Sequence, residues 1–564
     1  MRGSEIYPIV SKPDRLSMNF SHSFSLYDKI DAVFIREVLR NEIGKSKMNG
    51  TLADIFDQTA LRMNSKDAIL FLRKGRLESR ITYASLQQIS NRVANRLKDL
   101  GFKKGERVVL FMPKSIEQVL FHLGIQKAGG ISIILNPGFK RDEMDYFLKD
   151  TDAKIVIAGK KEEALIQSID KERLTVSIDT EVPFAEEKLF PESSSQVIHV
   201  DRSLQDPAIL IYTSGTTGQP KGAILTHQNL IQDAKNIIQI WEITETDVLC
   251  HALPLFHVHG LCFALHTSLI VGAKIIMVDE FSSENVIHIL SRSEGELSCT
   301  LFMGVPTMYL KMIERLGDER RDFSHLRLLT SGSAPLLPKN FGRIKMVFGK
   351  EPVEREGMSE TGMNFSNPLR GMKKPGSIGL PLPNVEVKIV DPVTFQDLKL
   401  GEVGEIWLKG SNISPGYWRK PRDTEAAFVN GWFRTGDLGK RDEDGYYYLT
   451  DRLKHIIISG GENISPKEIE SVINRHQKVL ESCVIGIPDE KWGEKVVAAV
   501  VLKPGVVLTA KEMIDYCKNH LLDWKCPKEV FFLKELPRNK MGKILKDEVV
   551  KYILNPFPPR TATP

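Results

Sequence analysis

The segment from Thr213 to Gly222 (TSGTTGQPKG) holds small hydroxyl residues, glycines and one lysine within ten positions. Glycines let backbone N–H groups approach a bound oxyanion, and Ser and Thr hydroxyls add hydrogen-bond donors. Lys221 adds a full positive charge, so the segment predicts a polyphosphate-binding loop. It is not a Walker loop, because no Gly-Lys-Ser/Thr ends it, and it lacks the Gly-x-Gly-x-x-Gly dinucleotide pattern. The candidate phosphate ligands are Thr213, Ser214, Gly215, Thr216, Thr217, Gly218 and Lys221.

The elements around this loop alternate between apolar runs and helical periodicity. Residues 208–212 form an apolar run that predicts a strand ending at the loop, and residues 228–241 predict the helix that follows. Further apolar runs at 107–112 and 131–135 are separated by a helical pattern at 116–128. Strands that alternate with helices favour a mostly parallel α/β sheet.

The pattern of apolar and polar residues changes toward the carboxyl terminus. From about residue 376, short alternating strands among Gly and Pro turns predict an antiparallel or barrel-like part. A last unit of roughly 110 residues reads as small α+β. We therefore predict an α/β fold with a large amino-terminal domain of parallel sheets and a barrel-like part, followed by a small α+β domain. The expected divisions are an extension at 1–50, a main domain at 51–451 and a carboxy-terminal domain at 452–564.

Composition excludes several classes of protein. The chain has a hydrophobic content of 42%, a charged content of 26% and a net charge of +5 over 564 residues. These values are ordinary for a globular protein and give no argument for nucleic acid. The six cysteines have no C-x-x-C spacing, which argues against a zinc ribbon or a disulfide scaffold and fits a reducing compartment. No apolar run reaches the length of a membrane span, and the first residues lack a signal-peptide core. We expect a cytoplasmic protein, and the sequence leaves its oligomeric state open.

The loop at 213–222 resembles the phosphate loop of the adenylate-forming superfamily, in its acyl-CoA synthetase branch. A second segment, 354–361 (EREGMSET), resembles that superfamily's next signature. The resemblance implies that Glu360 is a magnesium ligand and that Ser359, after Gly357, directs a hydroxyl at the α-phosphate. Glu356 departs from the pattern, because the superfamily has an aromatic residue against the adenine there. The loop with Ser333, Ala334 and Pro335 resembles the adenine-side loop.

Three later segments complete the resemblance in the same order along the chain. Asp437, in WFRTGD, would accept hydrogen bonds from the ribose hydroxyls, a task suited to a carboxylate. Arg452 and Lys454, in DRLK, resemble the hinge on which the small domain rotates. Lys543, in PRNKMGK, would bridge the acid and the α-phosphate. The glycines that would line the path of the pantetheine thiol are Gly460 and Gly461.

The sequence identifies the acid substrate less closely than it identifies the nucleotide site. Residues 361–368 and 303–309 look closest to malonyl-CoA synthetases, which implies a basic group near a second carboxylate, and Lys311 is the candidate. His257 is expected at the acyl pocket. A fatty or aryl acid remains open.

A metal site is a weaker interpretation of the histidines and cysteines near residue 257, because the spacing of these candidate ligands matches no zinc pattern. Those candidates are His251, His257, His259, Cys250 and Cys262.

The resemblance implies an AMP-forming acid–thiol ligase that uses ATP, Mg²⁺ and coenzyme A. A malonate-like or fatty acid would first become an acyl adenylate, and then a thioester. Thr213, Glu360 and Lys543 would act directly on the reacting groups. The alternative is a non-catalytic nucleotide or acyl sensor, since Glu356 cannot stack on a purine as an aromatic ring does. A carrier-protein loader and luciferase-like oxidation are disfavoured rather than excluded.

Overall fold

The computed structural model describes residues 50–213, 219–459, 462–490, 492–539 and 542–554. These residues belong to one compact unit that spans 48–564. The expected amino-terminal extension lies outside the described residues, apart from Gly50.

The first sheet has nine strands and carries several of the candidate site residues at its edges. Its central strands run parallel, and the strands at both edges, β2 on one side and β14 and β15 on the other, are antiparallel to their neighbours. The strand order is β15 (Leu380–Pro381), β14 (Gly362–Ser366), β13 (Val353–Met358), β12 (Leu328–Ser331), β11 (Leu301–Gly304), β9 (Val248–His251), β10 (Lys274–Val278), β1 (Asp67–Arg73), β2 (Arg76–Thr82).

The second sheet has six strands and ends at the predicted phosphate loop. All are parallel except β8, which folds back on β7 as an antiparallel hairpin. The order is β6 (Thr175–Ile178), β5 (Ile155–Gly159), β3 (Arg107–Phe111), β4 (Ile131–Ile134), β7 (Pro207–Thr213), β8 (Lys221–Thr226). Strands β4 and β5 are buried along their whole length. Burial on both faces explains why their sequences are almost unbroken apolar runs.

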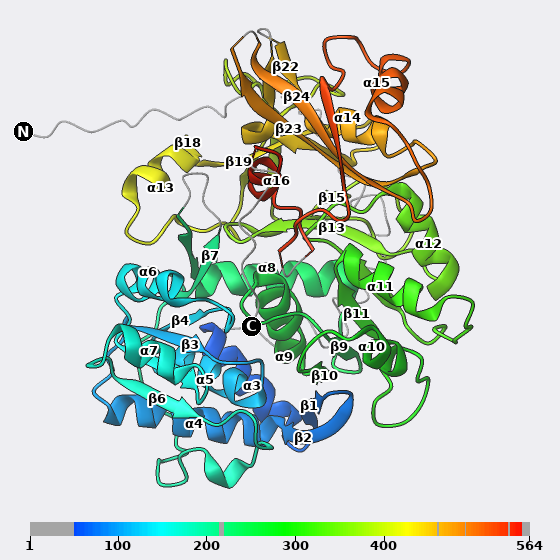
Figure 1. Cartoon of the computed structure of the whole chain (residues 1–564). Helices are drawn as coiled ribbons and strands as arrows, with labels where there is room; N and C mark the ends of the chain where they lie inside the picture. Colours follow the sequence, from blue (N-terminus) through cyan, green and yellow to red (C-terminus); the bar gives the residue numbers. More distant parts are fainter. Residues whose placement is uncertain (1–49, 214–218, 460–461, 491, 540–541, 555–564) are drawn as a thin grey trace, which may run out of the picture. The chain divides into compact units, whose positions relative to one another are not determined.

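Helices connect the parallel strands, and α4 packs against both α3 and α5 beside the strands of the first two sheets (Figure 1). The helices of this part are α3 (Leu52–Met63), α4 (Tyr83–Asp99), α5 (Ile116–Lys127), α6 (Arg141–Thr151), α7 (Glu163–Ile169), α8 (His227–Trp241), α9 (Thr267–Val271), α10 (Ser283–Leu290), α11 (Pro306–Leu316), α12 (Pro338–Phe348) and α13 (Pro421–Ala427), with a short 3₁₀ turn η1 (Glu186–Lys188). A π-helix, η2 (His259–His266), precedes α9.

Thr226 connects the phosphate-loop hairpin to α8. Its hydroxyl accepts a hydrogen bond from the backbone N–H of Asn229 at 3.2 Å. Such a bond satisfies one of the backbone donors that a helix leaves free at its amino end. The hairpin therefore runs directly into a capped helix.

The remaining strands form two further sheets. One is an antiparallel five-stranded sheet with the order β16 (Glu386–Val390), β17 (Gly404–Lys409), β19 (Trp432–Arg441), β18 (Phe428–Val429), to which β20 (Tyr447–Arg452) adds on β19. The other contains β22 (Glu462–Ile464), β21 (Ile457–Ser459), β24 (Gly493–Leu502) and β23 (Val479–Asp489), with β25 (Glu529–Leu533) parallel to β24. Its accompanying elements are η3 (Leu453–His455), α14 (Pro466–Ile473), α15 (Ala510–Lys518) and α16 (Lys546–Leu554).

Residues beyond 456 bury hydrophobic clusters of their own, built around Ile457, Val484 and Val500 on one side and Cys483 and Val549 on the other. The predicted α/β class, with parallel sheets, an antiparallel part and a small carboxy-terminal α+β part, is confirmed.

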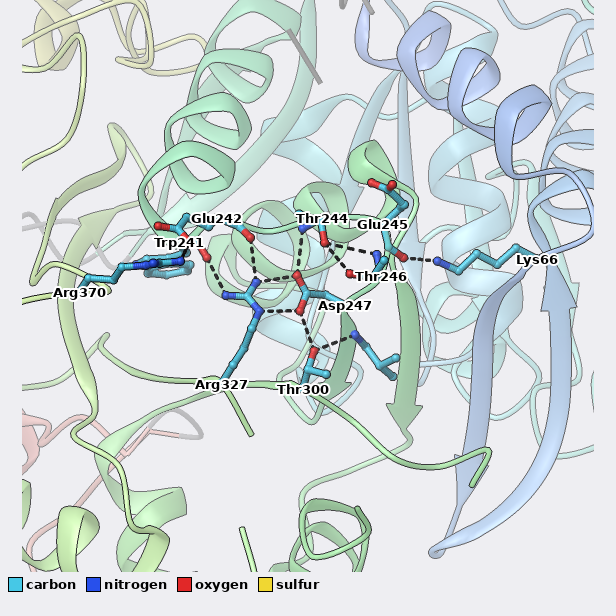
Figure 2. A network of polar contacts seen from close by, with 11 residues as sticks. Lys66, Trp241, Glu242, Thr244, Glu245, Thr246, Asp247, Thr300, Arg327 and Arg370 are labelled. Carbon is cyan, nitrogen blue, oxygen red and sulfur yellow. Dashed lines mark hydrogen bonds and ion pairs between the residues drawn. The ribbon is translucent and has the colours of Figure 1, made fainter. Parts of the chain in front are cut away.

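An ion pair between a half-buried arginine and a buried aspartate connects the carboxyl end of α8 to the first sheet (Figure 2). Arg327 donates from Nε to Asp247 at 2.7 Å and from Nη1 to the Trp241 carbonyl at 2.9 Å. Thr300 donates to the same carboxylate at 2.7 Å. Only 4% of the Asp247 side chain is exposed, so its charge depends on these partners. A cation over the last carbonyls of a helix also complements the helix dipole.

None of the helices in the described part of the chain is both long and apolar enough to cross a membrane.

Candidate nucleotide and acid site

The predicted phosphate loop lies in the chain between β7 and β8, which pair as an antiparallel hairpin. Thr213 and Lys221 face each other across the last register pair of this hairpin. Lys221 forms an ion pair with Asp423 and lies 5.5 Å from the ring centroid of Tyr417. The loop therefore has its cation at its base. The other predicted loop residues, Ser214, Gly215, Thr216, Thr217 and Gly218, lie outside the described residues.

Glu360, the predicted magnesium ligand, faces this hairpin. Its Oε1 accepts a hydrogen bond from the Tyr417 hydroxyl at 3.0 Å and a long one from Thr213 Oγ1 at 3.5 Å. Burial raises the pKa of Glu360. The hydrogen bond from Tyr417 and the charge of Arg452 oppose that rise, because both favour the ionised form. A buried carboxylate that is held by hydroxyls rather than by a fixed cation is suited to a metal ion.

Asp437, the predicted ribose ligand, lies beside Arg452 of the predicted hinge. They are register partners on β19 and β20, and Arg452 Nε lies 2.7 Å from Asp437 Oδ1. The Asp437 side chain is nearly buried, and its charge raises the pKa of Arg452. Lys454 follows in η3, where burial and then Arg452 lower its pKa.

Glu356 lies near the end of β13, where the strand bulges between Glu356 and Gly357. Asn364 donates from Nδ2 to Glu356 Oε2 at 3.1 Å. A Cβ on Gly357 would lie 2.5 Å from the Gly362 carbonyl oxygen, so the close approach of β13 and β14 excludes a side chain there. Ser359 lies in the turn that follows, before Glu360. The second predicted signature thus lies on one β-hairpin.

Lys543 reaches this region from the far end of the chain. A Cβ on Gly542 would lie 2.5 Å from Thr307 Oγ1, so the carboxy-terminal loop packs closely on the start of α11. Lys543 is open to solvent. Desolvation by the surrounding protein and then the positive charge of Arg452 nevertheless lower the pKa of Lys543 to about 8. The negative charge of Asp437 opposes this shift. Asp437 and Glu360 both act through space on the Lys543 ammonium, so the three side chains share one electrostatic environment.

Ser333 follows β12 with a φ of +66°, in the left-handed region. That conformation costs a non-glycine residue about 1–3 kcal/mol. The Ser333 hydroxyl lies 3.2 Å from His259 Nδ1 and accepts from Arg355 Nη2 at 3.5 Å. A Cβ on Gly332 would lie 2.6 Å from Arg355 Nε, so glycine is required for this approach. Ala334 and Pro335 come next in the same loop, before α12.

Arg355 is the group that the sequence reasoning left without a role. It is only 2% exposed, and its guanidinium carbon lies 5.0 Å from the ring centroid of Phe263 on the π-helix. Its buried Nε has no hydrogen-bond partner among the described residues. Burial lowers its pKa to about 10, which Glu356 and Asp233 oppose through space. Neither carboxylate forms an ion pair with it in the described structure.

The two predicted acid-pocket residues have different positions. His257 precedes the π-helix, and burial lowers its pKa to about 4. It is therefore neutral at physiological pH. Lys311 is exposed on α11, because that helix buries Met308, Tyr309 and Met312 on its other face. The structure therefore places Lys311 at the surface and not among the buried side chains. A basic residue that is buried in the described structure is Arg355.

The alternative metal site among the histidines and cysteines finds no support. Within the described ranges, no group of three or more His, Cys, Asp or Glu side chains could hold a metal ion. His251 instead bonds the Gly260 carbonyl through Nε2 at 2.8 Å, and Cys250 and Cys262 are buried and free. Gly460 and Gly461, predicted to line the thiol path, lie outside the described residues.

Two family models match the chain in tandem. The model described as AMP-binding enzyme covers residues 56–418, and the model described as AMP-binding enzyme C-terminal domain covers residues 468–543. The chain belongs to the AMP-binding enzyme family.

Curated relatives of this AMP-binding enzyme include ligases for different acids. A long-chain-fatty-acid–CoA ligase of Bacillus subtilis is 32% identical and aligns over 89% of this chain and 94% of its own. The mitochondrial malonate–CoA ligase of Bos taurus is 33% identical over 84% of this chain and 87% of its own. An oxalate–CoA ligase of Arabidopsis thaliana is 32% identical over 89% of this chain and 99% of its own.

Solved structures agree with the curated relatives. ATP-bound MatB from Rhodopseudomonas palustris superposes with a TM-score of 0.82 at 36% identity, covering 89% of this chain and 99% of that protein. An anthranilate–CoA ligase in complex with anthranoyl-AMP gives a TM-score of 0.79 at 28% identity, covering 90% of this chain and 98% of that protein. The chain is an AMP-forming acid–thiol ligase that uses ATP, Mg²⁺ and coenzyme A. This supports catalysis over a non-catalytic sensor.

The site of this ligase fits a magnesium–nucleotide complex. Magnesium is commonly bound through one or two carboxylates together with substrate phosphates, so a lone buried carboxylate such as Glu360 suffices. Bound there, the ion would neutralise phosphate charge, and Lys221 and Lys543 would add cations from two other segments.

Two features of the ligase escaped sequence reasoning. The π-helix η2 has no periodicity that separates it from an α-helix, although such helices are frequent at functional sites. Arg355 stood in a recognised motif on β13. No short-range signal in the sequence separated it from its neighbours, because Phe263 and Ser333, which lie beside it, belong to other elements.

Proposed function

We propose that this ligase activates a short dicarboxylic acid of the malonate type. The observation that carries the proposal is Arg355, a buried guanidinium whose Nε has no protein partner in the described structure and whose Nη2 reaches Ser333 Oγ. Removing one partner of a buried ion pair costs about 3–5 kcal/mol, so a buried cation without a carboxylate favours a ligand that supplies one.

The second carboxylate of malonate would satisfy this cation. Guanidinium and carboxylate form paired, charge-assisted hydrogen bonds. Ser333 and the neutral His259 add polar atoms beside Arg355. His259 Nε2 is also buried without a partner in the part of the chain that is described. A long-chain fatty acid would bring only methylenes to these groups and would leave the guanidinium uncompensated.

The reaction has two steps. A carboxylate oxygen of the acid bonds to the α-phosphorus of ATP as the bond to pyrophosphate breaks; then the thiolate of coenzyme A bonds to the acyl carbon as AMP leaves. We propose that Lys543 stabilises the charge that develops between the acid and the α-phosphate. Asp437, with Arg452 held beside it, would bind the ribose, and Glu360 would bind magnesium.

The remaining predicted residues keep proposed roles. The hydroxyl and backbone groups of the phosphate loop, with Lys221, would bind the β- and γ-phosphates. The nucleotide would also contact Ser333, Ala334, Pro335, Glu356, Gly357, Ser359 and Lys454, and His257 would line the acid pocket. Gly460 and Gly461 would line the thiol path.

We further propose a mobile lid that begins at Arg452 and a cytoplasmic location. The described structure holds six free, buried cysteines. Free thiols favour a reducing compartment, because disulfides form and persist in oxidising ones.

The test is AMP release across a panel of acids with ATP, magnesium and coenzyme A. We expect turnover with malonate to exceed that with butyrate, which has a similar size but no second carboxylate, and with palmitate. Preference for butyrate or palmitate would contradict the assigned substrate, while leaving the ligase reaction in place.

A further inference from the structure

Glu356 occupies a position that the catalytic account leaves unexplained. It follows Arg355 on β13, so the two side chains leave opposite faces of the strand. Asn364 holds Glu356 Oε2 at 3.1 Å. None of the described residues donates a hydrogen bond to Oε1, and the residue is half-buried, so part of it stays open to solvent. One carboxyl oxygen of Glu356 is therefore available to a ligand.

The charges around Glu356 belong to the proposed nucleotide site. The partial burial of Glu356 and, through space, the carboxylate of Asp437 on β19 raise the pKa of Glu356 to about 7. The Asn364 hydrogen bond from β14, the neighbouring Arg355 on β13 and Arg452 on β20 act in the opposite direction. Arg452 is already paired with Asp437, so it offers Glu356 only part of its charge.

We propose that Glu356 faces the purine and is protonated when ATP binds, so that nucleotide binding takes up one proton. This rests on the proposed nucleotide site. An ionised carboxylate is repelled both by the triphosphate and by the electron-rich face of the base. The neutral carboxylic acid is planar, carries no charge and gains an O–H donor for a purine nitrogen. Glu356 would thus bind the purine through a hydrogen bond, where an aromatic residue would bind it by stacking.

The sign of the effect follows from linkage. Bound nucleotide adds negative charge beside Glu356 and so raises its pKa further, which means that the bound state holds more protons than the free state. The free enzyme loses this proton as pH rises through about 7. ATP affinity should therefore fall as pH rises above that value.

The experiment is titration calorimetry of Mg·ATP into the full-length protein without acid substrate, at about pH 8, in two buffers with different ionisation enthalpies. The variants are Glu356→Gln, which is neutral at every pH, and Glu314→Gln, an exposed residue on α11, as the matched control. We expect the wild type and the control to take up about one proton more than Glu356→Gln. The KM for ATP of the wild type, relative to that variant, should rise about tenfold per pH unit above the pKa of Glu356.

Equal proton uptake in the wild type and Glu356→Gln would overturn the proposal. So would loss of ATP binding in Glu356→Gln at every pH with the fold retained, because it would mean that the ionised form is needed. Glu356→Tyr serves as a second probe, and we expect it to bind ATP without the pH dependence. If the wild type neither binds ATP nor releases AMP, the proposed function fails instead, and the two failures are distinguishable.

Discussion

Arg452 forms an ion pair with Asp437, with Nε 2.7 Å from Oδ1, and the two residues are register partners on β19 and β20. Arg452 also acts through space on Lys543, whose loop packs on Thr307 through Gly542. The last lysine signature, the proposed hinge and the proposed ribose carboxylate thus share one electrostatic environment. This arrangement would suit adenylation, in which Lys543 is proposed to stabilise the developing charge.

Replacing Lys543 by Ala should slow adenylation by about 10²–10³, because the site loses a fixed cation where negative charge develops. Acid-dependent pyrophosphate exchange measures that step. Lys534→Ala, an exposed lysine of the same region, is the control and should retain wild-type exchange. Exchange by Lys543→Ala at the wild-type rate would remove Lys543 from the mechanism.

The lowered pKa of Lys543 predicts a pH dependence of its own. The group is protonated below about pH 8 and loses its charge above that value, so kcat/KM for adenylation, which reports ionisations of the free enzyme, should fall above pH 8 rather than near the ordinary lysine value. Lys543→Arg, which stays charged, should move this decline to higher pH. A wild-type kcat/KM that stays flat well into the alkaline range would contradict the assignment.

Arg355→Met keeps much of the side-chain volume and removes the charge. We expect kcat/KM for malonate to drop by about 10² or more, since a charge-assisted bidentate contact is lost. Butyrate should lose far less, because it offers nothing for the guanidinium to bind. Arg76→Met, at an exposed position of β2, is the control. An equal loss for both acids would indicate a structural role for Arg355.

Glu360→Gln exchanges an anionic oxygen for an amide oxygen and retains an acceptor for Tyr417. The magnesium concentration that gives half-maximal AMP release should rise by about tenfold or more. Glu314→Gln again serves as the control. An unchanged magnesium titration would show that the ion is held elsewhere.

Arg327→Leu should destabilise the first sheet by about 3–5 kcal/mol, since it leaves a buried carboxylate without its main partner. That carboxylate is Asp247. The urea midpoint of unfolding measures the loss, and Arg320→Leu, at an exposed position, is the control. A midpoint that matches the control would show that Thr244 and Thr300 suffice to hold the charge.

The same ion pair predicts a pH dependence of stability. Burial raises the pKa of Asp247, but hydrogen bonds from Arg327, Thr244 and Thr300 hold it below its ordinary value. A lowered pKa means that the stabilisation is present at neutral pH and vanishes as pH falls through that lowered value. The difference in urea midpoint between the wild type and Arg327→Leu should therefore shrink in acid, and a constant difference would contradict this account.

Much of the site could be predicted because its residues lie in local motifs. The strand that ends near Thr213 and the glycine-rich segment after it can be predicted from a short window, whereas the return strand β8, which pairs Lys221 with Thr213, was not predicted. Asp437 and Arg452 were each predicted from a separate motif. Their pairing depends on the β19–β20 register, which no short stretch of sequence contains.

The acid pocket shows where sequence reasoning stops. Lys311 looked suitable by motif spacing alone, yet Met308, Tyr309, Met312 and Ile313 already define the buried face of α11. An apolar stripe at that spacing leaves Lys311 on the opposite face. Arg355 could not be preferred over its neighbours, because its environment comes from residues on separate elements, namely Phe263, Ser333 and His259.

The most direct test of the account is exchange of labelled pyrophosphate into ATP by the purified protein with magnesium, in the presence of malonate, butyrate or palmitate and without coenzyme A. We predict exchange that requires an acid and is fastest with malonate. Absence of exchange with every acid, from protein that is folded and binds Mg·ATP, would contradict adenylation itself.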